Sequence, residues 1–157
     1  MANEAKRQFR GAYDHVLDDK ARVIIPTKWR ESLTEGIVLC RSLDGTHCIW
    51  GFAENDFTRF LEELDSSVPM GDAEGARQLR LLQSSISEVE MDKQGRILVS
   101  PLLRNHAMTP EGANVKFVGM TSRFEMWNPD RYEQGQQGVE PQELLNKYDS
   151  FKRSKAE

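Results

Sequence analysis

Short apolar segments recur along the chain, and most of them end at a turn signal. Runs rich in β-branched and aromatic residues, bounded by Asp, Gly or Pro, are typical of β-strands. A proline follows the second run of each half and predicts a short helix there. Pro26 predicts a helix at residues 27–33, and Pro101 predicts a helix that Ser100 caps. The predicted strands lie at residues 12–17, 23–25, 37–41 and 47–52, and again at residues 86–91, 97–99, 114–120 and 124–128.

A helical periodicity marks the region between the two halves. Apolar residues at positions i, i+3, i+4 and i+7 form one stripe of a helix at residues 55–65. Asp72 then predicts the N-cap of a second helix. Near the end of the chain, residues 135–138 are rich in Gln and Gly and predict a loop, and residues 141–153 predict a final helix. The stripe of the first helix consists of Phe57, Phe60, Leu61 and Leu64.

The two halves repeat one motif. Asp18 opens a turn that closes at Arg22, and Asp92 opens a similar turn that closes at Arg96, 74 residues further on. Each motif continues into a β-branched strand, and an arginine recurs at the same offset downstream, at positions 30 and 104. Asp favours such turns because its carboxylate accepts hydrogen bonds from backbone N–H groups nearby. An internal repeat is the simplest interpretation.

Half a small sheet with one apolar face is only marginally stable, so we expect the two halves to bury their faces on each other. The sequence therefore predicts an α+β fold, mainly β, in which two pseudo-symmetric repeats close a β-barrel with helices at its periphery. The expected units are a first repeat at residues 9–53, linking helices at 54–85, a second repeat at 86–129, and a tail at 130–157 that is helical in part.

Charge is segregated along the chain. The net charge of −4 by itself argues against a nucleic-acid binder, but residues 1–30 carry seven basic and four acidic side chains. A local basic surface is what DNA binding requires. No apolar run approaches the roughly 20 residues needed to span a bilayer, and the polar N-terminus does not resemble a signal peptide, so we expect a cytoplasmic protein. Cys40 and Cys48 are expected to be free thiols, with a disulfide across a hairpin as the alternative.

The doubled motif resembles the MraZ family. The resemblance covers residues 9–127 and includes Phe9-Arg10-Gly11, both Asp-x-x-x-Arg motifs and residues 124–127, Phe-Glu-Met-Trp. It implies the double-split, swapped-hairpin β-barrel of AbrB-like proteins and a nucleoid-associated transcription regulator. It also implies ring-like homo-oligomers that bind repeated boxes of double-stranded DNA upstream of a cell-division and cell-wall gene cluster.

Candidate DNA contacts follow from the resemblance and from the chemistry of the side chains. The family attributes its DNA contact to the Asp-x-x-x-Arg loop, which here carries Lys20 and Arg22 and, by repeat symmetry, Lys93 and Arg96. Arginine can reach a phosphate or the O6/N7 edge of guanine, and lysine can contact phosphates. Lys28, just downstream, is a further candidate. The alternative interpretation is an ion pair within each turn, Asp18 with Arg22 and Asp92 with Arg96, that merely fixes the turn.

Two arginines and one alanine in or near these motifs call for separate interpretation. We expect Arg30 and Arg104, among apolar neighbours in short helices, to have structural roles. The family usually has Gly where this chain has Ala21. If that position needs a positive φ, Ala is unfavourable there by about 1 kcal/mol, so we expect the first loop to use a different turn.

The sequence shows no constellation that favours an enzyme. His15, His47 and His106 are isolated, and no residues show the spacing of a catalytic site, a metal site or a cofactor site. We therefore expect no catalysis, no cofactor, no small-molecule substrate and no membrane partner. The alternative to a DNA-binding regulator is an oligomeric scaffold on the same barrel, which would use the acidic helix at residues 55–65 as its docking face.

Overall fold

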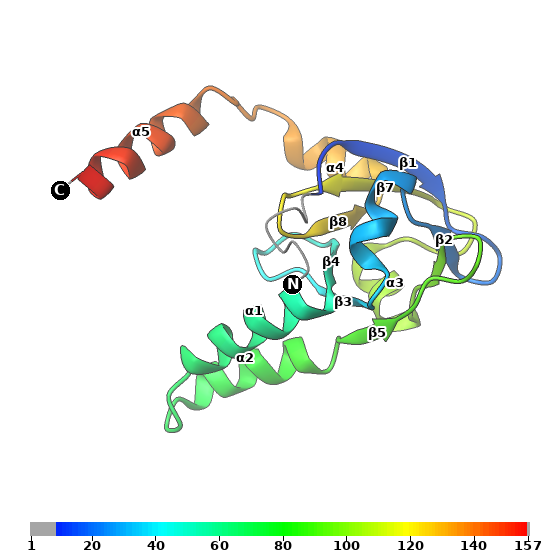
Figure 1. Cartoon of the computed structure of the whole chain (residues 1–157), viewed down its shortest axis with the longest axis horizontal. Helices are drawn as coiled ribbons and strands as arrows, with labels where there is room; N and C mark the ends of the chain where they lie inside the picture. Colours follow the sequence, from blue (N-terminus) through cyan, green and yellow to red (C-terminus); the bar gives the residue numbers. More distant parts are fainter. Residues whose placement is uncertain (1–8, 157) are drawn as a thin grey trace.

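A computed structural model of the chain describes residues 9–156. Eight antiparallel strands form a six-stranded sheet and a separate two-stranded ribbon, and helices lie outside them (Figure 1). The ribbon pairs β2 (Arg22–Ile24) with β6 (Arg96–Leu98). The order across the sheet is β1 (Ala12–Val16), β7 (Asn114–Gly119), β8 (Phe124–Trp127), β4 (Ile49–Ala53), β3 (Ile37–Arg41) and β5 (Ser87–Val89).

Strand pairing exchanges partners between the two halves. The first strand of each half pairs with the third strand of the other, β1 with β7 and β5 with β3. The second strands pair with each other, and so do the fourth strands. Exchanging the two halves reverses the order of the sheet and leaves every pair unchanged, so the predicted two-repeat, mainly β architecture has pseudo-two-fold pairing.

The predicted closed barrel is not confirmed. Among residues 9–156, β1 and β5 are the edge strands of the large sheet, and no ladder joins them. The chain leaves each edge strand through an Asp turn and enters the ribbon, where the N–H of Ile25 donates to the carbonyl of Gly95 and that of Val99 donates to Ala21. These turns direct β2 and β6 away from the sheet, so the ribbon packs against the sheet without joining it.

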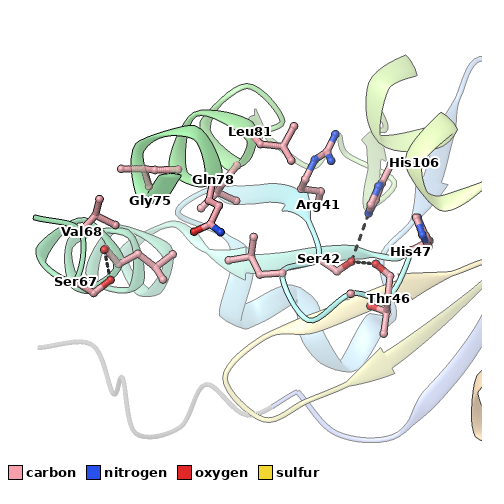
Figure 2. A pocket seen from close by; sticks show the side chains of 15 residues that line it. Arg41, Ser42, Thr46, His47, Ser67, Val68, Gly75, Gln78, Leu81 and His106 are labelled. Atoms are coloured by element: carbon pink, nitrogen blue, oxygen red, sulfur yellow. Dashed lines mark hydrogen bonds between the residues drawn. The ribbon is translucent and has the colours of Figure 1, made fainter. Parts of the chain in front are cut away.

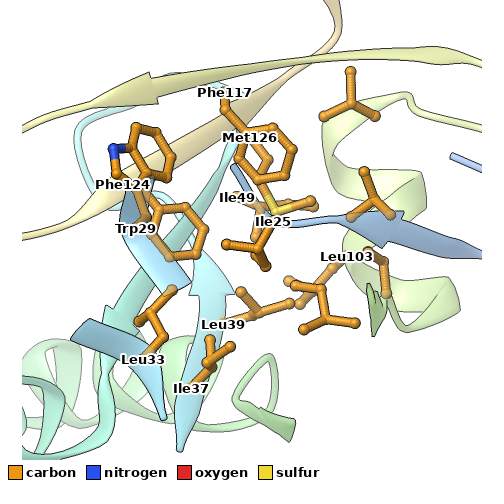
Figure 3. Packing of buried hydrophobic residues seen from close by; sticks show 14 of the residues in the cluster. Ile25, Trp29, Leu33, Ile37, Leu39, Ile49, Leu103, Phe117, Phe124 and Met126 are labelled. Carbon is orange, nitrogen blue, oxygen red and sulfur yellow. The ribbon is translucent and has the colours of Figure 1, made fainter. Parts of the chain in front are cut away.

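A single apolar core fills the space between sheet and ribbon (Figure 3). Trp29 of the 3-10 helix η2 (Thr27–Leu33) meets Phe9, Phe117 and Phe124 at ring-centroid distances of 5.6 to 5.9 Å. Leu103 of α3 (Pro101–Ala107) is fully buried in the same cluster. Because the core contains residues of both halves, neither half can bury its apolar face alone. The ribbon contributes Val23 and Ile97, and the sheet contributes Leu39, Ile49, Val115 and Met126.

A helical hairpin covers the opposite face of β3 and β4. It consists of α1 (Glu54–Ser66) and α2 (Ala73–Gln83), which project from the sheet on the side away from β2 (Figure 1). Phe52 packs on Phe57 and Phe60 at 5.3 Å, so the predicted stripe of α1 faces the sheet. Asp72 caps α2 as predicted, because its carboxylate accepts a hydrogen bond from the N–H of Gly75 at 2.8 Å.

Two helices end the chain. The prediction of a loop at residues 135–138 is wrong for its first two residues, because α4 (Pro129–Gln136) extends through them. Asn128 caps α4 by accepting hydrogen bonds from two backbone N–H groups, and Pro129 occupies the first turn. The final helix α5 (Glu143–Ala156) projects away from the sheet, and every side chain on it is exposed (Figure 1).

Both cysteines are free and buried. Cys40 lies in β3, and Cys48 directly precedes β4. Burial raises the pKa of each thiol to about 12. The prediction of free thiols is confirmed, and the alternative of a disulfide is wrong.

Candidate nucleic-acid interface

The first turn is organised around the carboxylate of Asp18. Its Oδ1 accepts hydrogen bonds from the backbone N–H groups of Lys20 at 2.9 Å and Arg22 at 2.8 Å. Its Oδ2 accepts a bond from Nε of Arg22 at 3.0 Å. The carboxylate therefore fixes both the backbone of the turn and the direction of the arginine side chain.

The second turn reproduces this arrangement. Oδ1 of Asp92 accepts from the N–H groups of Gln94 and Arg96, both at 2.9 Å, and Oδ2 accepts from Nε of Arg96 at 2.7 Å. The backbone bonds to Arg22 and Arg96 are the largest cause that holds the pKa of Asp18 and Asp92 below the usual 3.8. Hydrogen bonds to the ionised form of a carboxylate stabilise that form.

The expectation that Ala21 forces a different turn is wrong. Ala21 has φ +60° and Gly95, its counterpart, has φ +81°. The carbonyl of Ala21 accepts a hydrogen bond from the N–H of Val99, and the carbonyl of Gly95 accepts one from the N–H of Ile25, both at 2.9 Å. Pairing between the halves therefore holds Ala21 in a backbone conformation that its side chain disfavours.

Arg30 and Arg104 occupy structural positions. Nε of Arg30 donates to the carbonyl of Ile25, and Nε of Arg104 donates to that of Val99, each at 3.0 Å. A Cβ atom placed on Gly95 would lie 2.6 Å from Cζ of Arg30, so the guanidinium covers the turn of the opposite half. Arg30 thus joins the end of β2 to the turn of the second half, and Arg104 joins the end of β6 to Glu111.

The ribbon brings the two motif arginines onto one surface. Arg22 pairs with Leu98 and Ile24 pairs with Arg96, while Val23 between them is buried. Because side chains alternate between the faces of a strand, these four residues share the outer face. Arg22 and Arg96 are diagonal neighbours in the ladder, a relation that places backbones about 7–8 Å apart.

Each motif arginine keeps part of its guanidinium free for a ligand. Only Nε binds Asp18, and Nη1 and Nη2 of Arg22 have no partner within residues 9–156. Arg96 differs, because its Nη2 also donates to the side chain of Gln94 at 3.2 Å. The structural and the functional interpretations of the motif are therefore compatible, since the ion pair orients an arginine whose outer nitrogens remain available.

The three candidate lysines are exposed and lie around the ribbon. Lys20 and Lys93 occupy the tips of the two turns, which antiparallel pairing places at opposite ends of the ribbon. Lys28 lies in η2, which begins just after Ile25, the residue bonded to Gly95 of the second turn. The structure brings all five candidate residues to the ribbon and its two ends.

Sequence reasoning missed two residues of this surface. Ile24 and Leu98 are 39% and 58% exposed between the arginines. Each is the middle residue of an apolar triplet, 23–25 or 97–99, whose outer members are buried. Strand alternation predicts that such a middle residue faces outward, so the signal was present in the sequence.

The sequence of the chain matches the family model of the MraZ protein, whose description calls it antitoxin-like, at residues 8–81 and again at residues 84–149. The chain belongs to the MraZ family. The second match extends beyond the residues that carried the resemblance and reaches into α5.

Curated relatives support the same assignment. The chain is 37% identical to the "Transcriptional regulator MraZ" of Lachnoclostridium phytofermentans over 125 residues, 80% of this chain and 84% of the relative. The same identity and coverage hold for the protein of that name in Ligilactobacillus salivarius. The relative in Roseiflexus castenholzii is 35% identical with equal coverage.

Within residues 9–156, no three His, Cys, Asp or Glu side chains gather as they would around a metal ion. None of the helices in residues 9–156 is both long and apolar enough to cross a membrane.

We expect Ala21→Gly to stabilise the fold and Gly95→Ala to destabilise it. At positive φ, relief of the strain on Ala21 contributes about 1–2 kcal/mol, which exceeds the roughly 0.8 kcal/mol lost with one buried methyl group. The free energy of unfolding in urea should therefore rise by up to about 1 kcal/mol in Ala21→Gly. Gly95→Ala should lose at least as much, because its new Cβ also meets Arg30. Equal destabilisation by both substitutions would contradict this account.

Acid should weaken the two turns. Because the pKa of each carboxyl is lower in the folded chain, its stabilising effect is complete above the unfolded value of 3.8 and is lost as pH falls through the folded value. The double variant Asp18→Asn/Asp92→Asn should be less stable than the wild type at pH 6. It should lose less stability than the wild type on acidification. Urea unfolding at a series of pH values measures both, and parallel curves would refute the assignment.

Proposed function

We propose that the chain is a sequence-specific DNA-binding transcriptional regulator that acts as a ring-like homo-oligomer on repeated promoter boxes. The observation that carries the proposal is the outer face of the β2–β6 ribbon, where Arg22 and Arg96 are oriented by Asp18 and Asp92. The major groove of B-DNA admits a two-stranded β-ribbon. The names of the curated relatives as transcriptional regulators support the same function.

Each residue of the ribbon has a role in this proposal. Nη1 and Nη2 of Arg22 and Nη1 of Arg96 reach guanine O6 and N7 or a phosphate, as arginine commonly does in the major groove. Lys20, Lys93 and Lys28 contact phosphates on either side. The exposed pair of Ile24 and Leu98 provides apolar contact for thymine methyl groups.

Family membership gives the proposal its biological setting. The resemblance supports boxes that lie upstream of a cell-division and cell-wall gene cluster and a protein that acts in the cytoplasm, on the nucleoid. It also implies that sheet and ribbon together correspond to the swapped-hairpin, AbrB-like barrel. One ribbon offers few cations on a chain of net charge −4, so several linked ribbons are needed for useful affinity.

Helix α5 supports the proposed homo-oligomer. Its apolar side chains form one stripe that is 53–69% exposed. The helix carries four basic and two acidic residues, whereas α1 carries one basic and five acidic residues. We therefore propose that α5 docks beside the acidic α1 of a second copy, which buries the stripe and pairs opposite charges. The stripe consists of Leu144, Leu145, Tyr148 and Phe151.

An oligomeric scaffold that does not bind DNA is the alternative. It would use the acidic helix α1 as its docking face and would leave the ribbon arginines without a role. Binding of DNA that depends on the ribbon separates the two functions.

Arg22→Ala should abolish specific DNA binding while the chain stays folded. The turn should persist because Asp18 still accepts two backbone N–H groups. One good bidentate contact to a base contributes about 1–3 kcal/mol, and each oligomer loses several, so we expect far more than a tenfold loss. Fluorescence anisotropy measures this with a duplex that the wild-type chain has selected from a random library.

Arg77→Ala is the matched control for this experiment. Arg77 is an exposed arginine of α2 that pairs with Glu74, and we expect this substitution to leave DNA affinity unchanged. If the wild-type chain selects no duplex, or if a well-folded Arg22→Ala binds as tightly as the control, the proposed function is wrong.

Acidic substitutions on the stripe of α5 should reduce the size of the oligomer. We expect wild-type particles larger than a dimer and a lower mass for Leu145→Asp/Phe151→Asp, because two carboxylates cannot be buried at an apolar contact without a large loss of affinity. Asn146→Asp, on the opposite side of α5, is the control that adds charge without touching the stripe. Light scattering at micromolar concentration gives the masses. A monomeric wild type, or equal masses in all three, would refute the role of α5.

A further inference from the structure

A pocket of about 660 Å³ lies on the side of the fold that carries α1 and α2 (Figure 2). Its walls are the end of β3 and the segment that joins it to β4, the C-terminal end of α1, most of α2, and His106 of α3. None of the five candidate DNA contacts lines it. Its volume is within the range of about 300–1,000 Å³ that small-molecule sites occupy.

Basic and hydroxyl side chains gather at one end of this pocket. The rings of His47 and His106 have centroids 5.3 Å apart, and Nε2 of His106 lies 3.4 Å from Oγ of Ser42. Figure 2 shows the side chain of Arg41 beside His106. Nε of Arg41 is buried and has no hydrogen-bond partner within residues 9–156. A buried N–H of a cation is unfavourable when it has no acceptor, and no described residue supplies one at this end of the pocket.

The described residues that line the pocket include one arginine and two histidines, and no carboxylate is among them. Burial is the largest cause that lowers the pKa of His106, and the positive charge of Arg41 lowers it further. The potential that acts on His106 therefore favours a negative charge placed beside it.

The rest of the lining is mainly apolar. Leucines of α1 and α2 and Val68 between these helices form the walls. Leu81 is 52% exposed at the rim of the pocket, and Leu82, in the last turn of α2, is fully buried. A small site of this type binds the apolar body of a ligand by burial and selects its polar group by a few placed contacts. The apolar lining consists of Leu43, Leu64, Val68, Leu79, Leu81 and Leu82.

We propose that this pocket binds a small amphiphilic anion, with its acidic group at Arg41, His47 and His106 and its apolar body along α2. The acidic group accepts from the outer Nη groups of Arg41, because Nε lies beneath the surface that a ligand can reach. The inference is independent of the proposed DNA contacts, because the pocket and the ribbon share no residue.

A pair of fluorescent probes tests the proposal. 8-Anilinonaphthalene-1-sulfonate has an aromatic body and one sulfonate, and N-phenyl-1-naphthylamine has nearly the same body without the charge. We expect the wild-type chain to bind the sulfonate more tightly than the neutral probe. Arg41→Gln should weaken the sulfonate by about tenfold or more, as expected for loss of a hydrogen bond to a charged group, and should leave the neutral probe nearly unchanged.

Two further variants control this experiment. Leu81→Glu places a carboxylate at the exposed rim and should also weaken the sulfonate, with little effect on folding. Arg77→Gln removes an exposed arginine of the same helix that does not line the pocket and should change nothing. Circular dichroism and urea unfolding check the fold of each variant.

We expect apolar probes also to bind any part of the α5 stripe that a second copy leaves uncovered, and this binding would respond differently. Probe bound there depends on neither Arg41 nor Leu81. Loss of sulfonate affinity in Arg41→Gln and Leu81→Glu, with Arg77→Gln unchanged, supports the pocket. Equal affinity in all folded variants, or no preference of the wild type for the sulfonate, overturns the proposal.

Discussion

The antiparallel pairing of β2 with β6 is the constraint on which the rest of the structure depends. Each arm has three residues and comes from a different half of the chain. The bonds of Ile25 to Gly95 and of Val99 to Ala21 continue the pairing into the opposite turn. Two short strands alone are marginal in water, so the ribbon must rest on the shared core through Val23 and Ile97. Neither half can therefore fold without the other, and the two arginines reach their positions only when both halves have folded together.

The Asp–Arg pairs matter more for orientation than for stability. The side chains of Arg22 and Asp18 are 29% and 33% exposed, and ion pairs of this kind contribute only about 0–1 kcal/mol. The same contact directs a long, flexible side chain toward the outer face of the ribbon and, within residues 9–156, leaves both Nη groups of Arg22 and Nη1 of Arg96 unbound. Preorganisation of this kind lowers the conformational entropy lost when a ligand binds. Two weak ion pairs in equivalent turns are thus better explained by ligand binding than by folding.

Much of the fold was predictable because its signals are local. The doubled Asp-x-x-x-Arg motif, all eight strands, the α1 stripe and the Asp72 cap follow from residues close together in sequence. Pairing between strands of different halves did not follow, because alternation assigns a face to a side chain and says nothing of which strand lies beside it. For that reason the common surface of Arg22 and Arg96 emerged only from the structure. The conformation of Ala21 was mispredicted because a local preference was overridden by bonds to Val99, and α4 was missed although Asn128-Pro129 is a regular helix start.

The ribbon and the pocket meet different ends of one short helix. Leu98 ends the ribbon, Ser100 caps α3 two residues later, and His106 near the end of that helix faces the pocket. In the two proposals, the ligand would contact His106 within α3, and DNA would contact Leu98, three residues before this helix begins. Coupling between them requires two arrangements of α3 that bind the ligand with different affinity. Such coupling is reciprocal: DNA would change the affinity of the pocket for its ligand by the same factor by which the ligand changes the affinity for DNA.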